Sequence, residues 1–398
     1  MLRKSRLFTP GPTPLLPVAA QAMASADIHH RTADFRALYQ RVLSDLRVFI
    51  GTGNPVVLMA SSGTGAMEAA VANLTSPGEK VLVLTAGKFG ERWRALCKAY
   101  GCDTQQVTAE YGQAIPLEAV RGKLTPEMRV VFVQATESST GARHPIAQIA
   151  RLARENGSLL VVDAITGLGT TELDVDGWGV DVIIGGSQKA LMIPPGLAYC
   201  AVSERAWQAM EKSKNPRFYF DLRKERAAGE KGESAFTPAI ALVAALGAAL
   251  DYIRAAGSGD LAAGRDALIH NAETAAGMTR AAARALGLQL FAPDAPSNAL
   301  TAVVPPANVD SGVIVKDFRE RFGAVVANGQ GEMKGKIFRI AHIGYYDYLD
   351  TMGIIGALEH VIAKVTSPKH VEFGAALRAA QEVYIRAATS AQSLVASR

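Results

Sequence analysis

The sequence predicts an α/β protein: a large domain built on a mostly parallel sheet, followed by a smaller α+β domain. Up to Glu204, short β-branched runs alternate with segments whose apolar residues recur every three to four positions. That alternation is typical of strand–helix–strand units with right-handed crossovers. After Glu204 the pattern changes to long alanine-rich helical segments with a few later strands. The length of 398 residues suits two domains, which we place at 21–256 and 257–398, after an N-terminal arm over 1–20.

The elements are expected in the following order. Residues 1–20 are rich in proline and predict an irregular arm. Apolar spacing predicts helices in the large domain over 34–50, 65–73, 91–100 and 146–154. Short apolar runs predict its strands at 56–59, 80–84, 130–133, 159–162, 182–184 and 197–202. For the smaller domain we expect a long helix at 236–256 leading into it, further helices at 261–286 and 353–392, and strands at 299–304, 323–326 and 337–340.

Composition narrows the functional class. The formal net charge is +5, but the basic residues are scattered, whereas a nucleic-acid-binding protein concentrates them in a stripe. The longest apolar run, residues 239–250, is too short to span a bilayer, and residues 1–12 do not resemble a secretory signal. Three cysteines suggest a reducing compartment, and neither they nor His29 and His30 have companions at metal-ligand spacing. We therefore expect a cytoplasmic protein with no metal, nucleic-acid or membrane partner.

A lysine and an aspartate carry the strongest functional signal. Asp163 closes the strand at 159–162, and Lys189 follows the strand at 182–184 within the segment GGSQK. Ligands of α/β sheets sit at strand ends. A lysine amine that condenses with an aldehyde, and a carboxylate that keeps a ring nitrogen protonated, are what pyridoxal phosphate requires. This pair predicts a pyridoxal phosphate site.

Four further segments fit such a site, although each also has a plainer interpretation. SSGTGAME at 61–68 follows a strand and opens a helix, as a phosphate cradle does, but a glycine turn capping a helix looks the same. Phe89 could stack on a flat cofactor or belong to the core. The hydroxyls after the strand at 130–133 could bind a cofactor oxygen or form a polar turn. Arg339, in an apolar stretch, could bind a substrate carboxylate or form a structural ion pair.

The order of these segments resembles the class V, fold-type I pyridoxal phosphate aminotransferases, in particular the alanine–glyoxylate and serine–pyruvate (serine–glyoxylate) group. The resemblance runs from FTPGP at 8–12 to about residue 363, and GGSQKAL with the later PPG is its most specific part. It implies a three-layer large domain, a smaller α+β C-terminal domain and a homodimer that shares its active sites. It also implies a ping-pong transamination between a small amino acid, such as alanine or serine, and glyoxylate or pyruvate.

The resemblance also implies a role for each matching residue. Lys189 would be the catalytic lysine that bonds to the cofactor and Asp163 the partner of its ring nitrogen. The other cofactor-binding residues would be Thr64, Gly65, Ala66, Phe89, Ser138, Gln188 and, from the partner subunit, Thr237. Arg339 and Gly11 would meet the substrate. Some relatives carry a tyrosine three residues before the threonine, where this chain has Ser234.

Several alternatives stay open. Aspartate or ureidoglycine could be the donor, with Arg31, Arg92 or Arg143 binding a second carboxylate. A cysteine desulfurase of the same fold needs a nucleophilic cysteine late in the chain, and none follows Cys200. A Rossmann dehydrogenase would need a GxGxxG loop, which is missing. A binding protein without activity would not need both Lys189 and Asp163.

Overall fold

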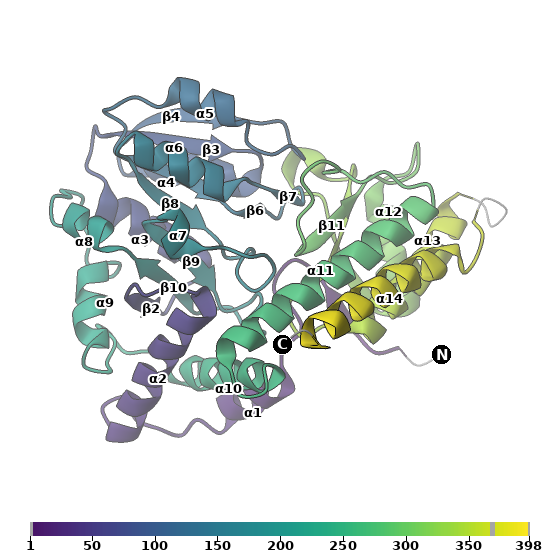
Figure 1. Ribbon diagram of the computed structural model, residues 1–398, viewed down its shortest axis with the longest axis horizontal. Helices are drawn as coiled ribbons and strands as arrows, with labels where there is room; N and C mark the ends of the chain where they lie inside the picture. Colours follow the sequence, from purple (N-terminus) through teal and green to yellow (C-terminus); the bar gives the residue numbers. More distant parts are fainter. Residues whose placement is uncertain (1–2, 367–370, 397–398) are drawn as a thin grey trace.

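The fold is built on two sheets, a large one and a small one. The structure is a computed structural model, and it describes residues 3–366 and 371–396. Seven strands form the large sheet, and four form the small sheet. Figure 1 shows the large sheet on one side of the molecule and the small sheet, beside its long helices, on the other.

The large sheet matches the predicted mostly parallel sheet. Only β10 runs against its two neighbours, and because two reversals cancel, β2 points in the same direction as β9. The carboxyl ends of six strands therefore meet at one edge, where ligands bind in such folds. The strand order is β2 (Val56–Met59), β10 (Ala198–Val202), β9 (Val182–Gly186), β8 (Leu159–Asp163), β5 (Val130–Gln134), β3 (Lys80–Thr85) and β4 (Asp103–Thr108).

Helices cover both faces of this sheet and give the large domain three layers. Alternate residues of a buried strand point to opposite faces, so Val161 and Val162 enter two different apolar clusters. One face is covered by α3 (Gly63–Leu74), α4 (Lys88–Ala99) and α8 (Glu204–Met210). The other is covered by α2 (Ala33–Ile50), α5 (Leu117–Lys123), α6 (Ile146–Glu155), α7 (Val175–Trp178) and α10 (Ile240–Ala256).

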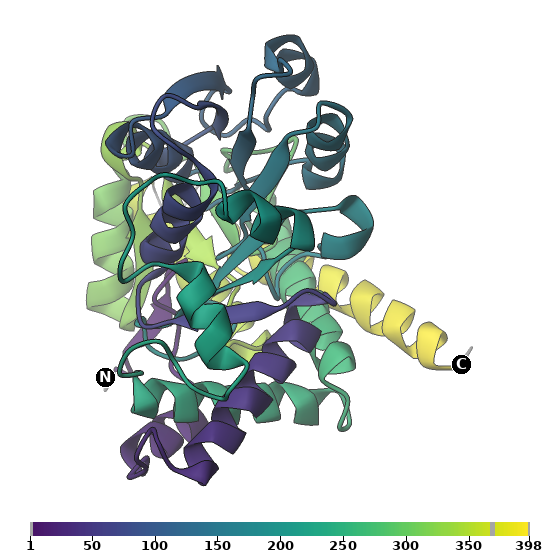
Figure 2. The ribbon, with the colours of Figure 1, turned by 90° about the vertical axis from the view of Figure 1, so that its left-hand side faces the viewer.

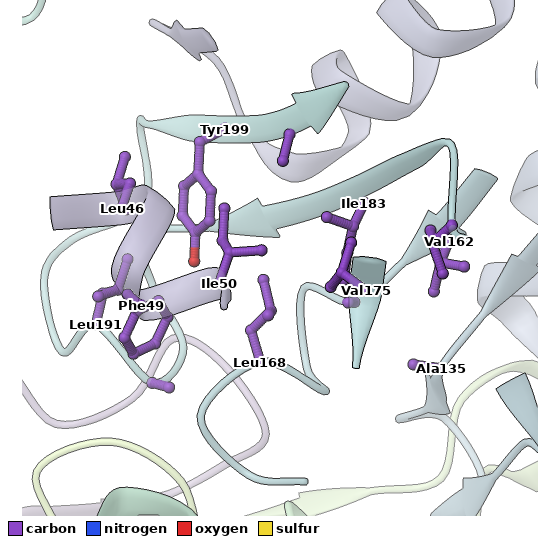
Figure 3. Packing of buried hydrophobic residues seen from close by; sticks show 14 of the residues in the cluster. Leu46, Phe49, Ile50, Ala135, Val162, Leu168, Val175, Ile183, Leu191 and Tyr199 are labelled. Atoms are coloured by element: carbon purple, nitrogen blue, oxygen red, sulfur yellow. The ribbon is translucent and has the colours of Figure 1, made fainter. Parts of the chain in front are cut away.

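Figure 3 shows this second cluster, in which Leu46, Phe49 and Ile50 of α2 surround Tyr199 of β10. Leu168 and Leu191 belong to the same cluster. Leu168 lies in the loop that follows Asp163, and Leu191 lies in the loop that follows Lys189. Packing of these two leucines in the core therefore holds both loops in place.

The small domain is an α+β unit, as predicted. Its sheet has the order β1 (Arg6–Phe8), β12 (Ala324–Asn328), β13 (Phe338–Ala341) and β11 (Leu300–Val303). The long helices α11 (Leu261–Ala285) and α14 (Ala375–Ala396) lie side by side (Figure 1). In Figure 2 the C-terminal part of α14 extends beyond the rest of the ribbon. The other helices here are α12 (Ser311–Asp317), the π-helical turn Phe318–Phe322, the 3-10 turn Gly331–Met333 and α13 (Tyr348–Val365).

The N-terminal arm is more ordered than predicted, so the expectation of an irregular segment is wrong for two parts of it. Residues 6–8 form β1, which pairs with β12 of the small sheet, and α1 (Pro17–Ala24) begins within the arm. Between them, Thr13 and Leu16 donate main-chain hydrogen bonds to the carbonyls of Gln188 and Met192, at 3.2 and 2.9 Å. The arm thus connects the small sheet to the segment that carries Lys189.

The predicted large-sheet strands agree with the observed ones to within two residues at either end. Beyond the arm, three strands were not predicted: β4 and the hairpin strands β6 (Thr136–Glu137) and β7 (Ala142–Arg143). The shorter helices α5, α7, α8, α9 (Leu222–Gly229) and α12 were not predicted either. The long helix before the small domain begins at Ile240 rather than 236, after Pro238. The predicted tail helix is two helices, α13 and α14, and residues 367–370 between them lie outside the described part.

Among the described residues, no single helix has the length and apolar composition to cross a bilayer. Only α10 and α11 taken together meet that criterion, and they are bent by 82° at their junction.

Candidate active site

A cavity of about 280 Å³ opens at the carboxyl edge of the large sheet. Loops that follow β2, β3, β5, β8 and β9 contribute to it, together with the arm. A larger hollow of about 430 Å³ lies between α2 and α11, but no lysine lines it. The residues around the smaller cavity are Gly11, Pro12, Ser62, Gly63, Thr64, Phe89, Arg92, Thr136, Ser138, Asp163, Ile165, Thr166, Gln188, Lys189 and Pro195.

Lys189 is buried at this edge, three residues after β9 ends. The loop that carries it is fixed by Ser187, whose hydroxyl donates to the Pro194 carbonyl at 2.7 Å and accepts from the Leu197 N–H at 3.2 Å. The lysine Nζ donates a hydrogen bond to the carbonyl of Pro10 in the arm. Burial lowers the pKa of Lys189 to about 8, against the opposing effect of Asp163. The neutral form is therefore more populated near neutral pH than in an ordinary lysine, and a neutral amine is a nucleophile and a base.

Asp163 is the last residue of β8 and lines the same cavity. Burial raises the pKa of its carboxyl group to about 6, while the Ile165 N–H, which donates to Oδ1 at 2.9 Å, and the charges of Lys189 and Arg92 lower it. A cation bound in the cavity would lower this pKa further. The carboxylate is thus prepared to pair with a protonated ring nitrogen.

Gly11 comes close to the lysine. A Cβ at this position would lie 2.5 Å from Lys189 Nζ, and its φ of +149° is one that other residues rarely adopt. Glycine is the residue type that lets the arm pass over the amine, so the predicted substrate contact at Gly11 lies next to Lys189.

The glycine-rich loop after β2 opens α3, with a small shift from the prediction. The prediction assigned the phosphate-binding amides to Gly65 and Ala66, but neither lines the cavity. The helix begins at Gly63, and the Gly65 N–H donates to the Ser62 carbonyl at 2.8 Å. Its first turn therefore presents the amides of Gly63 and Thr64, together with the positive end of the helix dipole, to the cavity. The residues of this turn that line the cavity thus lie two positions before those predicted, and the phosphate contacts themselves stay a prediction.

Phe89 and Ser138 reach the cavity from two elements joined by a buried carboxylate. Glu137 accepts hydrogen bonds from the N–H groups of Phe89 (3.1 Å) and Gly90 (3.2 Å) at the start of α4. It also accepts from the N–H and hydroxyl of Ser139, at 3.1 and 2.5 Å, and from the Gln134 amide at 3.1 Å. We name this set of five hydrogen bonds the Glu137 clasp. It sets the position of the aromatic ring relative to the Ser138 turn.

Arg339 lies behind this turn, in the middle of β13 of the small sheet. It is 4% exposed and is absent from the cavity lining. Its Nη1 donates to the Ser138 carbonyl at 2.6 Å, and its Nε and Nη2 donate to the Asn328 carbonyl at 3.2 and 2.5 Å. Burial lowers the pKa of Arg339 to about 10, so it remains a cation. Three of its five N–H groups are used, and one remains on each terminal nitrogen.

The other predicted residues differ in their placement. Gln188 lines the cavity, and its Oε1 is buried without a hydrogen-bond partner in the protein. Thr237 is exposed and lies outside the cavity of its own subunit. Ser234 donates to the Glu225 carboxylate at 3.4 Å within the same subunit.

Thr136 and Thr166 line the cavity but were not named from the sequence, and Arg92, named there only as one of three arginines that could bind a second carboxylate, also lines it. Arg92 follows Phe89 by one helical turn, so it lies on the same face of α4. That spacing is the signal that singles out Arg92 from Arg31 and Arg143. Thr136 and Thr166 each follow a strand end closely, which gives only a weak signal.

Comparison with known proteins agrees with this geometry. The family model of the class V aminotransferases matches residues 18–312. The chain belongs to the class V aminotransferases. Their cofactor is pyridoxal phosphate, and the chain is a pyridoxal phosphate-dependent transaminase with the fold-type I architecture. This confirms the family, fold, enzyme class and cofactor predicted from the sequence.

Three similar proteins illustrate the range of names among the relatives of this class V aminotransferase. L-aspartate–glyoxylate aminotransferase of Paracoccus denitrificans is 32% identical, and the match covers 100% of both chains. The structure of alanine–glyoxylate aminotransferase from Nostoc is 30% identical, covering 91% of this chain and 96% of that one, with a TM-score of 0.84. The soluble hydrogenase 42 kDa subunit of Anabaena cylindrica is 36% identical over 96% of this chain and 99% of that protein.

The cavity can be compared with what a metal site and a pyridoxal phosphate site each require. Across the residues that the structure describes, no three His, Cys, Asp or Glu side chains lie together as a metal site requires. The cavity instead suits pyridoxal phosphate. It offers a buried amine, a buried carboxylate, an aromatic ring, a helix N-terminus and the Gln188 side chain, whose amide nitrogen is a hydrogen-bond donor.

Proposed function

We propose that this enzyme transfers the amino group of a small amino acid, alanine or serine, to glyoxylate. The observation that carries the proposal is the shared cavity of Lys189 and Asp163, with burial acting on the pKa of both groups. Pyruvate is the alternative acceptor.

In this proposal each residue has a defined task. Lys189 would hold the cofactor through its Nζ, and, once the substrate amine has displaced that nitrogen, the neutral Nζ would take the Cα proton of the amino acid. Asp163 holds the proton on the ring nitrogen, Phe89 stacks on the ring, and Ser138 lies beside the ring. Gly63, Thr64 and Gln188 surround the phosphate. When bound, pyridoxal phosphate supplies an aldehyde that captures amines and a ring that accepts electron density from Cα.

The substrate carboxylate is assigned to Arg339. Its two remaining N–H groups, one on each terminal nitrogen, suit a carboxylate that approaches end-on. The bonds to the Ser138 and Asn328 carbonyls hold the guanidinium plane in position. One such arginine favours a donor with a single carboxylate.

The test uses the purified holoenzyme without an acceptor. Alanine should bleach the visible band of the bound cofactor and release one pyruvate per active site, and glyoxylate should then restore the band and yield glycine. The variant Lys189→Ala should lose at least about 10³-fold in turnover, because both nucleophile and base are removed, yet still bind the cofactor. Unchanged turnover in this variant, or borohydride fixing the cofactor on another residue, would refute the proposal.

Aspartate is the second candidate donor. The relative from Paracoccus denitrificans is named for it and matches the whole chain. The same acceptor-free experiment with aspartate and serine ranks the donors, since each releases a different keto acid. A rate at least tenfold higher with aspartate than with alanine would replace the proposed donor while leaving transamination intact.

We further propose a homodimer in which Thr237 reaches the cofactor phosphate of the partner subunit. An aromatic patch supports this: Phe218 is 72% exposed, and Tyr219 is 44% exposed and stacks on Phe236, with ring centroids 4.9 Å apart. The patch adjoins Thr237 in the chain, and the Tyr219 hydroxyl lies 3.5 Å from the Ala60 carbonyl next to the glycine-rich loop. Exposed apolar clusters of this kind are typical of interfaces.

Light scattering of the purified protein tests the dimer. We expect twice the chain mass of 42.0 kDa, and a shift towards the monomer with loss of cofactor for Phe218→Asp. A wild-type monomer with full activity would contradict the shared site.

A cytoplasmic location is also proposed. Its support is chemical: Cys97, Cys102 and Cys200 are free thiols, two of them buried, as is usual in a reducing compartment. Cell fractionation with an antibody against the chain tests it, and recovery in a secreted or membrane fraction would contradict it.

A further inference from the structure

Arg92 is a cation of the active site to which the mechanism above gives no task. It lies one turn after Phe89 on α4, and its guanidinium carbon is 4.7 Å from the centre of the Phe89 ring. Its Nη1 donates to the Thr64 hydroxyl at 3.0 Å. Arg92 therefore bridges the residue expected to stack on the cofactor ring and the first turn of α3.

In the described part of the chain, Arg92 has no carboxylate within ion-pair distance, and the nearby Asp163 acts on it only as a longer-range charge. Among the described residues it makes no ion pair, and the hydrogen bond to Thr64 leaves most of its donors free. A half-buried guanidinium is stabilised when an anion completes its surroundings. The residues of α3 that face the cavity carry no charge, so the helix dipole is the only positive potential they offer.

The choice of anion follows from the distribution of charge in the cavity. Lys189 and Arg92 are the two cationic side chains that line it. In the proposed function Lys189 bonds to the aldehyde of the cofactor, and Arg339, behind Ser138, binds the substrate carboxylate. The anion left is the phosphate of the cofactor, which carries up to two negative charges, and Arg92 contacts the same helical turn that presents amides to it.

We propose that Arg92 is a phosphate-binding residue for pyridoxal phosphate, acting together with Thr64 and the first turn of α3. The inference rests on the proposed cofactor site at Lys189. Because the guanidinium also packs on Phe89, the same side chain holds the phosphate end and the ring-stacking residue in a fixed relation.

The test compares pyridoxal phosphate with pyridoxal, which lacks the phosphate. Binding of each to the apoenzyme is measured by the visible absorption of the bound form, at fixed ionic strength. We expect Arg92→Met to weaken pyridoxal phosphate about 10- to 100-fold, as for loss of a charge-assisted hydrogen bond, and pyridoxal less than about twofold. Arg92→Lys, which keeps the charge, should recover part of the difference. Added inorganic phosphate should strengthen pyridoxal binding to the wild type, and this effect should be smaller in Arg92→Met.

The matched control is Arg94→Met. Arg94 is an exposed arginine two residues further along α4, so this variant should change the affinity for neither ligand. Equal weakening of both ligands by Arg92→Met would overturn the proposal and leave Arg92 as a support for Phe89. A selective loss of aspartate turnover with phosphate binding unchanged would instead assign Arg92 to a second substrate carboxylate. Failure of the wild type to fix either ligand on Lys189 would refute the proposed site itself, which separates the two hypotheses.

Discussion

Lys189 is placed where its charged form is costly, and this governs how the enzyme takes up its cofactor. Burial lowers the pKa of the amine to about 8, and the nearby cations Arg339 and Arg92 act in the same direction. Asp163 opposes them. Only the neutral amine attacks an aldehyde, so the neutral fraction falls about tenfold for each pH unit below the pKa.

The first prediction is that cofactor uptake by the apoenzyme rises with pH and levels off above about 8. Replacing Asp163 by Asn removes the charge that raises this pKa, so the midpoint should move to lower pH. Stopped-flow absorption over the pH range measures both profiles. A midpoint near the ordinary lysine pKa, or an upward shift in Asp163→Asn, would contradict the role given to burial.

The second prediction concerns Gly11, where a side chain would meet the lysine amine. A methyl group in Gly11→Ala would lie 2.5 Å from Nζ, and the backbone would be strained at φ +149°. We expect cofactor uptake to slow by about 10²-fold, as for a reacting group displaced by about 1 Å. Gly122→Ala is the control, because an added Cβ there meets nothing within 4 Å and should leave uptake unchanged. Equal effects of the two variants would show that the clash with Lys189 is irrelevant.

At the scale of elements, the Glu137 clasp joins the start of α4 to the turn after β5. Its carboxylate is fully buried and accepts five hydrogen bonds. Removing it leaves several donors unsatisfied in a site without water access, which is costly.

The third prediction is that Glu137→Ala lowers the free energy of unfolding by about 3 kcal/mol and also weakens cofactor binding. Glu137→Gln should lie between this variant and the wild type, since one acceptor oxygen is kept. Glu127→Ala, at an exposed position with a surface pairing to Lys80, is the control. Denaturant unfolding and cofactor titration measure the effects. Lost stability with intact cofactor affinity would show that the clasp does not position Phe89 and Ser138.

The elements also show where sequence reasoning stops. The buried strands β8 and β9 were predicted within two residues because their apolar runs are bounded by polar or glycine residues. The edge strand β4 was missed because its sequence DTQQVT is partly exposed and has no apolar run. The start of α3 was placed two residues late because serine and glycine fit both the turn and the first helical positions.

At the scale of the whole molecule, the arm and the large domain line the site, and the small domain supports it from behind through Arg339 and β1. The order of motifs along the chain was enough to predict that Lys189, Asp163, Phe89 and Ser138 meet, because parallel strands deliver their ends to one edge. It could not predict the arm as a structural link, since the pairing of β1 with β12 joins residues at opposite ends of the sequence. Nor could it show that Arg339 is engaged by two main-chain carbonyls.

The fourth prediction tests this link. Deleting residues 1–8 removes β1 from the small sheet, so hydrogen exchange should accelerate in β12, its partner strand. Cofactor uptake should slow as well, because the remaining arm is no longer anchored over Lys189. Deleting residues 1–4, which lie before β1, should have a much smaller effect on both. Faster exchange in β12 with unchanged uptake would show that the arm is not part of the site.

The small sheet contributes two groups that lie near the Lys189 amine. Through its strand β1 it holds the N-terminal arm over Lys189, and its strand β13 carries Arg339. The small sheet is thus tied to the lysine loop through the arm and to the Ser138 turn through Arg339, so its position relative to the large sheet sets the placement of both.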